Sequence, residues 1–210
     1  MENELLFHWQ KLFEKYNTDV AFIRETGIML INRYNESHRK YHNLYHIRDM
    51  LNTIDRESKH LKKPALLLLA TWFHDAIYSP ENTDNETKSA ELAAEVLENS
   101  SLAPKEITYI SSLIKATAKH NWQDKNMDTA IFLDTDLSIL GASNANYDIY
   151  AHHIRMEYKQ FADEVYSQGR TKVLKSFLQK KYIFNTALFR EKFEQKARLN
   201  ISREILKYTS

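Results

Sequence analysis

Glycine and proline are scarce, and this constrains the fold more than any other feature of the sequence. The chain of 210 residues contains only three of each. β-Sandwiches and barrels need many turns, and those turns draw heavily on both residues. Gly-rich phosphate loops also need backbone positions that glycine alone adopts readily. The scarcity therefore argues against β architecture, dinucleotide-binding folds and P-loop folds.

Apolar spacing predicts helix along nearly the whole chain. Hydrophobic residues recur every three or four positions, as on the buried face of a helix, and Pro64 suits a first helical turn. The segment that follows Pro64 is apolar on every side, which predicts a central, buried helix. Helices are expected over 4–16, 19–35, 44–57, 64–77, 85–99, 104–119, 127–140, 144–161, 172–181 and 187–207, with Gly169 in a turn. The expected fold is an all-α bundle of roughly eight to ten helices.

Cysteine content and charge exclude several functions. The chain has no cysteine, so it has no disulfide, no thiolate nucleophile and no Cys-ligated zinc. Acidic and basic residues number 28 and 29, which gives no strong signal for nucleic acid or a membrane surface. The longest apolar run is too short to span a bilayer, and residues 1–10 do not resemble a signal peptide. A cytoplasmic protein is expected.

Two histidines are predicted to meet near the end of the apolar helix expected over 64–77. His74 and Asp75 are strongly polar in a buried segment, and desolvating them without a partner is costly. The turn between the third and fourth predicted helices centres near Leu61, with His46 roughly 15 residues before it and His74 about 13 after it. In an antiparallel helix pair the two histidines are therefore level to within a few ångström. A metal ion would partner both imidazoles and the carboxylate.

A further carboxylate could come from the stretch Asp134-Thr135-Asp136. Apolar residues flank it on both sides, so its charges again need a partner. Asp134 and Asp136 both remain candidates on this ground, and helix capping is the alternative use of either.

Five segments together resemble a known family. They are YHNLYHI at 41–47, WFHDAIY at 72–78, NETKSA at 85–90, FLDTDL at 132–137 and IRMEY at 154–158. Their order of His, His-Asp and Asp on helices is similar to the HD superfamily of metal-dependent phosphohydrolases, and their flanks resemble a bacterial subfamily of predicted HD phosphohydrolases. The resemblance covers residues from about 38 to 200. It implies one HD-type helical domain over 1–210, with a core at about 38–165 and flanking helices packed on it.

The resemblance also implies a ligand set. The family's ligands correspond to His46, His74, Asp75 and Asp134. His42 competes with His46, and the resemblance favours Asp134 over Asp136. Such a nitrogen and oxygen set suits a divalent ion such as Mn, Co, Ni, Mg or Fe.

Further residues are candidates for catalysis or substrate binding. Asp75 is expected to orient a metal-bound water as well as ligate the ion, while His120 and Glu86 are expected on the substrate side or as additional metal-site groups. A phosphate needs cations against its charge, and Arg155 is preferred, with Glu157 expected to hold it. The other candidates for substrate contact are Lys119, His42, Arg170 and Arg198.

The sequence supports three interpretations of function. The preferred one is an enzyme, a metal-dependent phosphohydrolase that acts on a small phosphorylated metabolite such as a nucleotide. The second is a metal-stabilised module that senses a nucleotide without turnover. The third is an HD-type di-iron oxygenase, which His42 and His120 keep open as further ligands. A homodimer is left open, and no nucleic-acid or membrane partner is expected.

Overall fold

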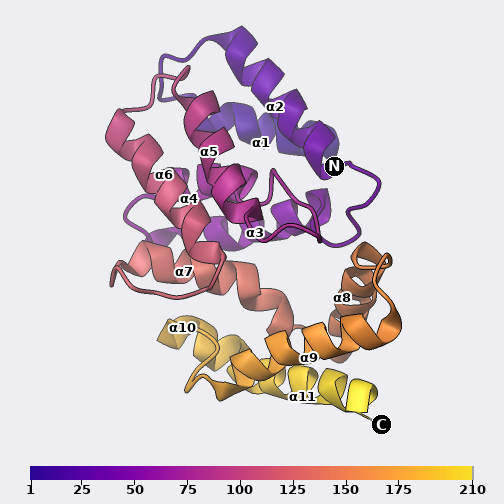
Figure 1. The fold of residues 1–210 in the computed structure, drawn as a ribbon. Helices are drawn as coiled ribbons and strands as arrows, with labels where there is room; N and C mark the ends of the chain where they lie inside the picture. Colours follow the sequence, from indigo (N-terminus) through magenta and orange to yellow (C-terminus); the bar gives the residue numbers. More distant parts are fainter. Residues whose placement is uncertain (210) are drawn as a thin grey trace. The chain divides into compact units, whose positions relative to one another are not determined.

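The computed structural model describes residues 1–209, and over these residues it contains helices joined by turns and no strand (Figure 1). The all-α prediction is confirmed. The α-helices are α1 (Glu2–Leu12), α2 (Val20–Tyr34), α3 (Leu44–Arg56), α4 (Pro64–Phe73), α5 (Asn85–Leu97), α6 (Pro104–Thr117), α7 (Met127–Asp136), α8 (Asn144–Glu157), α9 (Asp163–Gln179), α10 (Ala187–Phe189) and α11 (Gln195–Thr209). Short 3-10 turns are η1 (Ser58–His60) and η2 (Leu137–Gly141), and a π turn is η3 (Arg190–Glu194).

The chain divides into two compact units. The N-terminal unit is Met1–Phe132 and the C-terminal unit is Leu133–Ser210, so the division falls within α7. The prediction that residues 1–210 fold as one domain stays a prediction. No helix in the described part of the chain is both long and apolar enough to cross a membrane.

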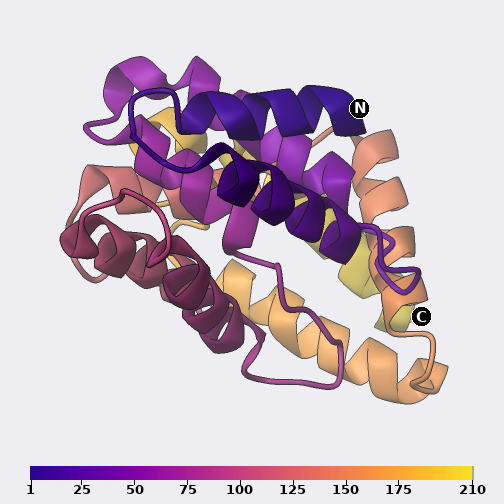
Figure 2. The ribbon, with the colours of Figure 1, turned by 90° about the horizontal axis from the view of Figure 1, so that it is seen from above.

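Helix α4 is the centre of the N-terminal unit. Every residue from Leu66 to Phe73 is buried, as its all-round apolar sequence predicts. Helices α1, α3, α5 and α6 all contact it. The pairs α1 with α2 and α5 with α6 lie side by side, as both ribbon views show (Figure 2). The aromatic core of this unit is Trp9 with Trp72 and Phe73, whose ring centroids lie 5.5 and 6.0 Å from that of Trp9.

The segment that leads into α4 is anchored by the beginning of α7. Pro64 occupies its first turn, where the missing N–H costs nothing. The buried carboxylate of Asp128 accepts hydrogen bonds from the backbone N–H groups of Lys62 and Lys63, at 3.0 and 2.8 Å. The first turn of α7 thus anchors the helix that leads to His74.

In the C-terminal unit, α11 packs against α9 and η2. A buried ion pair holds α9 to α11, with Arg170 Nε 2.8 Å from Glu204 Oε1, and Tyr147 of α8 donates to Glu204 Oε2 at 2.6 Å. Gly141 closes η2 where the backbone of Phe193 approaches. A Cβ at that position would lie 2.8 Å from the carbonyl oxygen of Phe193, so the contact requires glycine.

Several predicted helix boundaries were wrong: the expected ends at residues 16, 77 and 161 are late, because α1, α4 and α8 end at Leu12, Phe73 and Glu157, and the turn expected at Gly169 is helical. Helix α4 ends at Phe73 rather than near Ile77, because the hydroxyl of Tyr34 and the side chain of His74 bind its last carbonyls. Helix α9 begins at Asp163 and runs through Gly169, where a turn was predicted. Nothing lies within 4 Å of a Cβ built at Gly169, so this glycine is an exposed helical position, and Asp163 and Glu164 supply the acidic first turn.

Candidate metal centre

The end of α4 is built to present His74. The last carbonyls of a helix lack partners within it. Here Thr71 O accepts from His74 Nδ1 at 2.9 Å, Trp72 O accepts from the Tyr34 hydroxyl at 3.1 Å, and Phe73 O accepts from Ala76 N at 3.0 Å. The helix therefore stops at His74, and its side chain is held against its own last turn.

His46 comes from the first turn of α3. The Asn43 side chain caps this helix by accepting from Tyr45 N at 2.9 Å, while its amide donates to Lys40 O at 2.7 Å. Helix α3 contacts α4, so the predicted hairpin is present. His46 and His74 are 6% and 1% exposed, and both lie in the interior.

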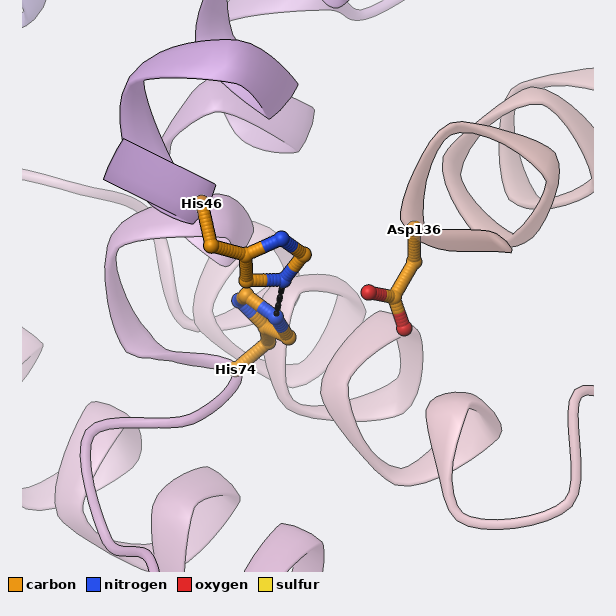
Figure 3. Close-up of side chains that lie close together, drawn as sticks. All are labelled: His46, His74 and Asp136. Carbon is orange, nitrogen blue, oxygen red and sulfur yellow. Dashed lines mark hydrogen bonds between the residues drawn. The ribbon is translucent and has the colours of Figure 1, made fainter. Parts of the chain in front are cut away.

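Three ligand-type atoms converge in the N-terminal unit. His46 Nε2 lies 3.2 Å from His74 Nε2 (Figure 3), and Asp75 Oδ2 lies 3.0 Å from His74 Nε2 and 3.9 Å from His46 Nε2. The predicted meeting of His46, His74 and Asp75 is thus present. Two atoms that each sit about 2.1 Å from one ion are about 3.0–3.4 Å apart in octahedral or tetrahedral geometry. The separations of 3.2 and 3.0 Å fit this range, and the 3.9 Å between His46 Nε2 and Asp75 Oδ2 is longer.

The proton positions also fit a cation. A carbonyl oxygen only accepts, so His74 Nδ1 carries the proton that it donates to Thr71 O. His74 Nε2 then faces both His46 Nε2 and Asp75 Oδ2, at 3.2 and 3.0 Å. Such a meeting of acceptors is unfavourable unless a proton or a metal ion lies among them. Fixing the outer nitrogen with a backbone carbonyl is also how proteins orient metal-bound imidazoles.

Arg39 ties together the backbone around the centre, and the sequence did not reveal it. Its side chain is fully buried, and it donates to the backbone oxygens of His42, Asp75 and Ala76 at 3.2, 2.7 and 3.2 Å. The sequence contains 29 lysines and arginines, and no pattern marks which of them is buried. This residue could be found only from the fold.

The connection between α4 and α5 is fixed by the start of α5. Ser89 accepts from Ile77 N and donates to Ile77 O, at 3.0 and 3.2 Å. Asn85 accepts from Ser79 N and donates to Ser79 O, at 3.1 and 2.8 Å. These bonds hold the segment that follows Asp75.

Asp134, the predicted fourth ligand, has other partners within the C-terminal unit. Its Oδ1 accepts from Asn185 N and Nδ2 at 2.6 and 3.1 Å, and its Oδ2 accepts from Thr186 N and Oγ1 at 2.8 and 2.7 Å. Burial raises the pKa of Asp134 above its ordinary value, although these hydrogen bonds oppose the shift. Its carboxylate anchors the segment that leads into α10.

Asp136 was the alternative carboxylate. It ends α7 and is half-buried. His46, His74 and Asp136, the side chains drawn in Figure 3, are a group that could hold a metal ion.

Four other predicted site residues belong to the N-terminal unit. His42 precedes α3, and its ring centroid lies 4.3 Å from that of Tyr78 and 6.0 Å from that of His46, so it is next to the centre. Glu86 is half-buried in the first turn of α5. Lys119 is exposed, and His120 is half-buried with a φ of 44°. Their predicted roles stay predictions.

The predicted phosphate-binding arginines have structural partners in the C-terminal unit. Arg155 donates to Asp163 at 2.6 Å and to the carbonyls of Tyr158 and Phe161 at 2.9 and 3.1 Å, so it braces the turn between α8 and α9. Arg170 binds Glu204 and Arg198 binds Glu194. These contacts give each of the three guanidiniums a carboxylate partner within the protein, without a substrate. A substrate role for Arg155 stays a prediction.

Known proteins were compared at three levels. No family model, no curated protein and no solved structure matches the chain. The case for function therefore rests on the residues of the centre and on the resemblance of its segments.

Proposed function

We propose that this protein is a metal-dependent phosphohydrolase of the HD type that acts on a small phosphorylated metabolite. The observation that carries the proposal is the convergence of His46 Nε2, His74 Nε2 and Asp75 Oδ2 within 3.0 to 3.9 Å. Two buried imidazoles and one carboxylate form a ligand set for a divalent ion that leaves positions for water and substrate. The likeness of segments 41–47 and 72–78 to HD phosphohydrolases supports the choice of phosphate chemistry.

We assign the carboxylate ligand from α7 to Asp136 rather than to Asp134, the residue that the resemblance favours. The Phe132 ring packs edge-on against the ring of His74, with centroids 6.4 Å apart. Residues four apart share a face of a helix, whereas residues two apart point to nearly opposite faces. Asp136 therefore shares the face of Phe132, and Asp134 points away toward its partners Asn185 and Thr186.

We assign different roles to the imidazoles and to the carboxylate of the centre. A divalent ion bound there would polarise a phosphoryl oxygen and lower the pKa of a bound water. The side chains of His46 and His74 are 5% and 1% exposed, whereas that of Asp75 is 14% exposed. The imidazoles therefore keep water from the inner side, and substrate approaches from the side of Asp75. Asp75 is suited to orient the attacking water there.

The test is a phosphate-release screen on protein purified without chelator. Nucleotides and sugar phosphates are the substrates, before and after the metal is stripped and Mn²⁺, Co²⁺, Ni²⁺, Mg²⁺ or Fe²⁺ is returned. His74→Ala is the test variant. His60→Ala is the matched control, because His60 lies in the same unit with a side chain 46% exposed.

The proposal predicts phosphate release that depends on the ion, is lost in His74→Ala and persists in His60→Ala. A protein that binds the ion but releases no phosphate from any substrate in the panel is a sensor rather than an enzyme. A protein that binds no ion has neither function.

A further inference from the structure

All three guanidinium nitrogens of Arg39 donate hydrogen bonds within the N-terminal unit. Nη1 donates to Asp75 O at 2.7 Å and to His42 O at 3.2 Å, and Nη2 donates to Ala76 O at 3.2 Å. Nε donates to Glu36 Oε2 at 2.9 Å. The side chain is 0% exposed, while that of Glu36 is 40% exposed, so the charge is buried and its one acidic partner reaches solvent.

The three carbonyls belong to the two segments that supply the ligands. Asp75 and Ala76 form the turn after α4, where helical hydrogen bonding has ended. His42 immediately precedes Asn43, the N-cap of α3, and His46 lies in the first turn of that helix. One guanidinium thus ties the backbone of Asp75 to the start of the helix that carries His46.

Two aromatic rings keep the guanidinium in place. Its central carbon lies 5.1 Å from the ring centroid of Tyr34 and 5.4 Å from that of Tyr78. The Tyr34 hydroxyl also binds the last turn of α4 through Trp72 O. The planar guanidinium fits between these two rings and donates to carbonyls of two segments at the same time. A lysine ammonium is a point charge and cannot span both segments.

We infer that Arg39 is the positioning residue of the metal centre, because it sets the distance between Asp75 and the imidazole of His46. The inference rests on the proposed function, since it needs an ion at His46, His74 and Asp75. Groups that orient metal ligands typically change metal affinity by about 10- to 100-fold when they are replaced. Arg39 should act in this way without touching the ion.

The experiment compares Arg39→Lys with wild type in Co²⁺ binding. Calorimetry gives the Kd, the visible d–d absorption reports the ligand geometry, and circular dichroism gives the unfolding midpoint separately. Arg56→Lys is the control, because Arg56 is exposed and binds Thr53 of its own helix. Glu36→Gln is a milder variant that removes one charged acceptor of Arg39 from an exposed position.

We expect Arg39→Lys to remain helical, to raise the Kd for Co²⁺ by about 10-fold or more and to change the absorption bands. Arg56→Lys should match wild type in both. A purely structural role would lower the unfolding midpoint of Arg39→Lys and leave its Kd and absorption bands unchanged, and this result would overturn the inference.

Two further outcomes are decisive. If Arg39→Lys does not fold, a weaker Co²⁺ affinity in folded Glu36→Gln supports the inference, and an unchanged affinity overturns it. If wild type binds Co²⁺ and only the inference fails, the metal centre stands. Wild type that binds no ion overturns both.

Discussion

The ring of Phe132 meets the ring of His74 edge-on, with centroids 6.4 Å apart and planes at 86°. This contact fixes the rotation of α7 at the residue where the N-terminal unit ends. Helical spacing then places Asp136 on the same face of α7 as Phe132 and Asp134 on the other face. The two neighbouring aspartates are therefore expected to serve different purposes.

The paired variants Asp136→Ala and Asp134→Ala test this division. We expect Asp136→Ala to weaken metal binding strongly with little change in stability. Asp134→Ala leaves the donors of Asn185 and Thr186 without their acceptor and should lower the free energy of unfolding by about 1–3 kcal/mol, with metal affinity unchanged. Metal titration and chemical denaturation of each variant measure the two effects. The reverse pattern would restore Asp134 as the ligand.

Alanine substitution of two glycines should change the free energy of unfolding in opposite directions. Gly141→Ala places a Cβ 2.8 Å from the backbone oxygen of Phe193, so we expect a loss of about 1–3 kcal/mol in the free energy of unfolding. Gly169→Ala meets nothing within 4 Å in the middle of α9 and should stabilise by about 0.5–1 kcal/mol. Thermal denaturation of both variants compares them. Equal effects would contradict the close approach at Gly141.

Acid should destabilise the C-terminal unit through Glu204. Burial alone would raise the pKa of Glu204, but the hydrogen bond and charge of Arg170, with the hydroxyls of Tyr147 and Tyr208, hold it below the ordinary 4.5. A carboxyl whose pKa is lowered by folding adds stability above its unfolded pKa and loses it as pH falls through its folded pKa. We expect the free energy of unfolding to fall as pH drops below about 4.5.

The variant Glu204→Gln isolates this contribution. Its free energy of unfolding should be lower than that of wild type at neutral pH, and the gap should narrow as acid is added. Glu95→Gln, at an exposed position in the middle of α5, serves as the control and should follow wild type. The measurement is denaturant unfolding at a series of pH values. A gap that stays constant into acid would exclude Glu204 as the titrating group.

Predictions from the sequence were most successful where the local pattern of one helix determines its burial. The all-round apolar pattern of 64–73 predicted a buried α4, and equal spacing from the turn predicted that His46 and His74 would meet. It did not identify hydrogen-bond partners that lie far apart in the chain. Asp134 binds residues 185 and 186, some fifty positions away in the chain, and no local pattern signals that pairing.

The same reason explains why other contacts were not foreseen. Arg39 and Arg155 are both arginines in polar segments, yet one is buried beside the predicted ligands and the other braces a surface turn. The end of α4 depends on Tyr34, which lies 38 positions away from Trp72. Gly169 was taken for a turn because glycine usually breaks helices, but the acidic first turn and the packing of α9 on α11 outweigh that cost.

The central claim is that His46, His74 and Asp75 form a metal centre. The most direct measurement is calorimetric titration of chelator-stripped protein with Co²⁺, followed by visible absorption, for wild type, His46→Ala, His74→Ala and the control His60→Ala. We expect saturable binding with d–d bands in wild type and His60→Ala, and loss of both in His46→Ala and His74→Ala. Wild type without saturable binding, or His74→Ala that binds as wild type does, would contradict it.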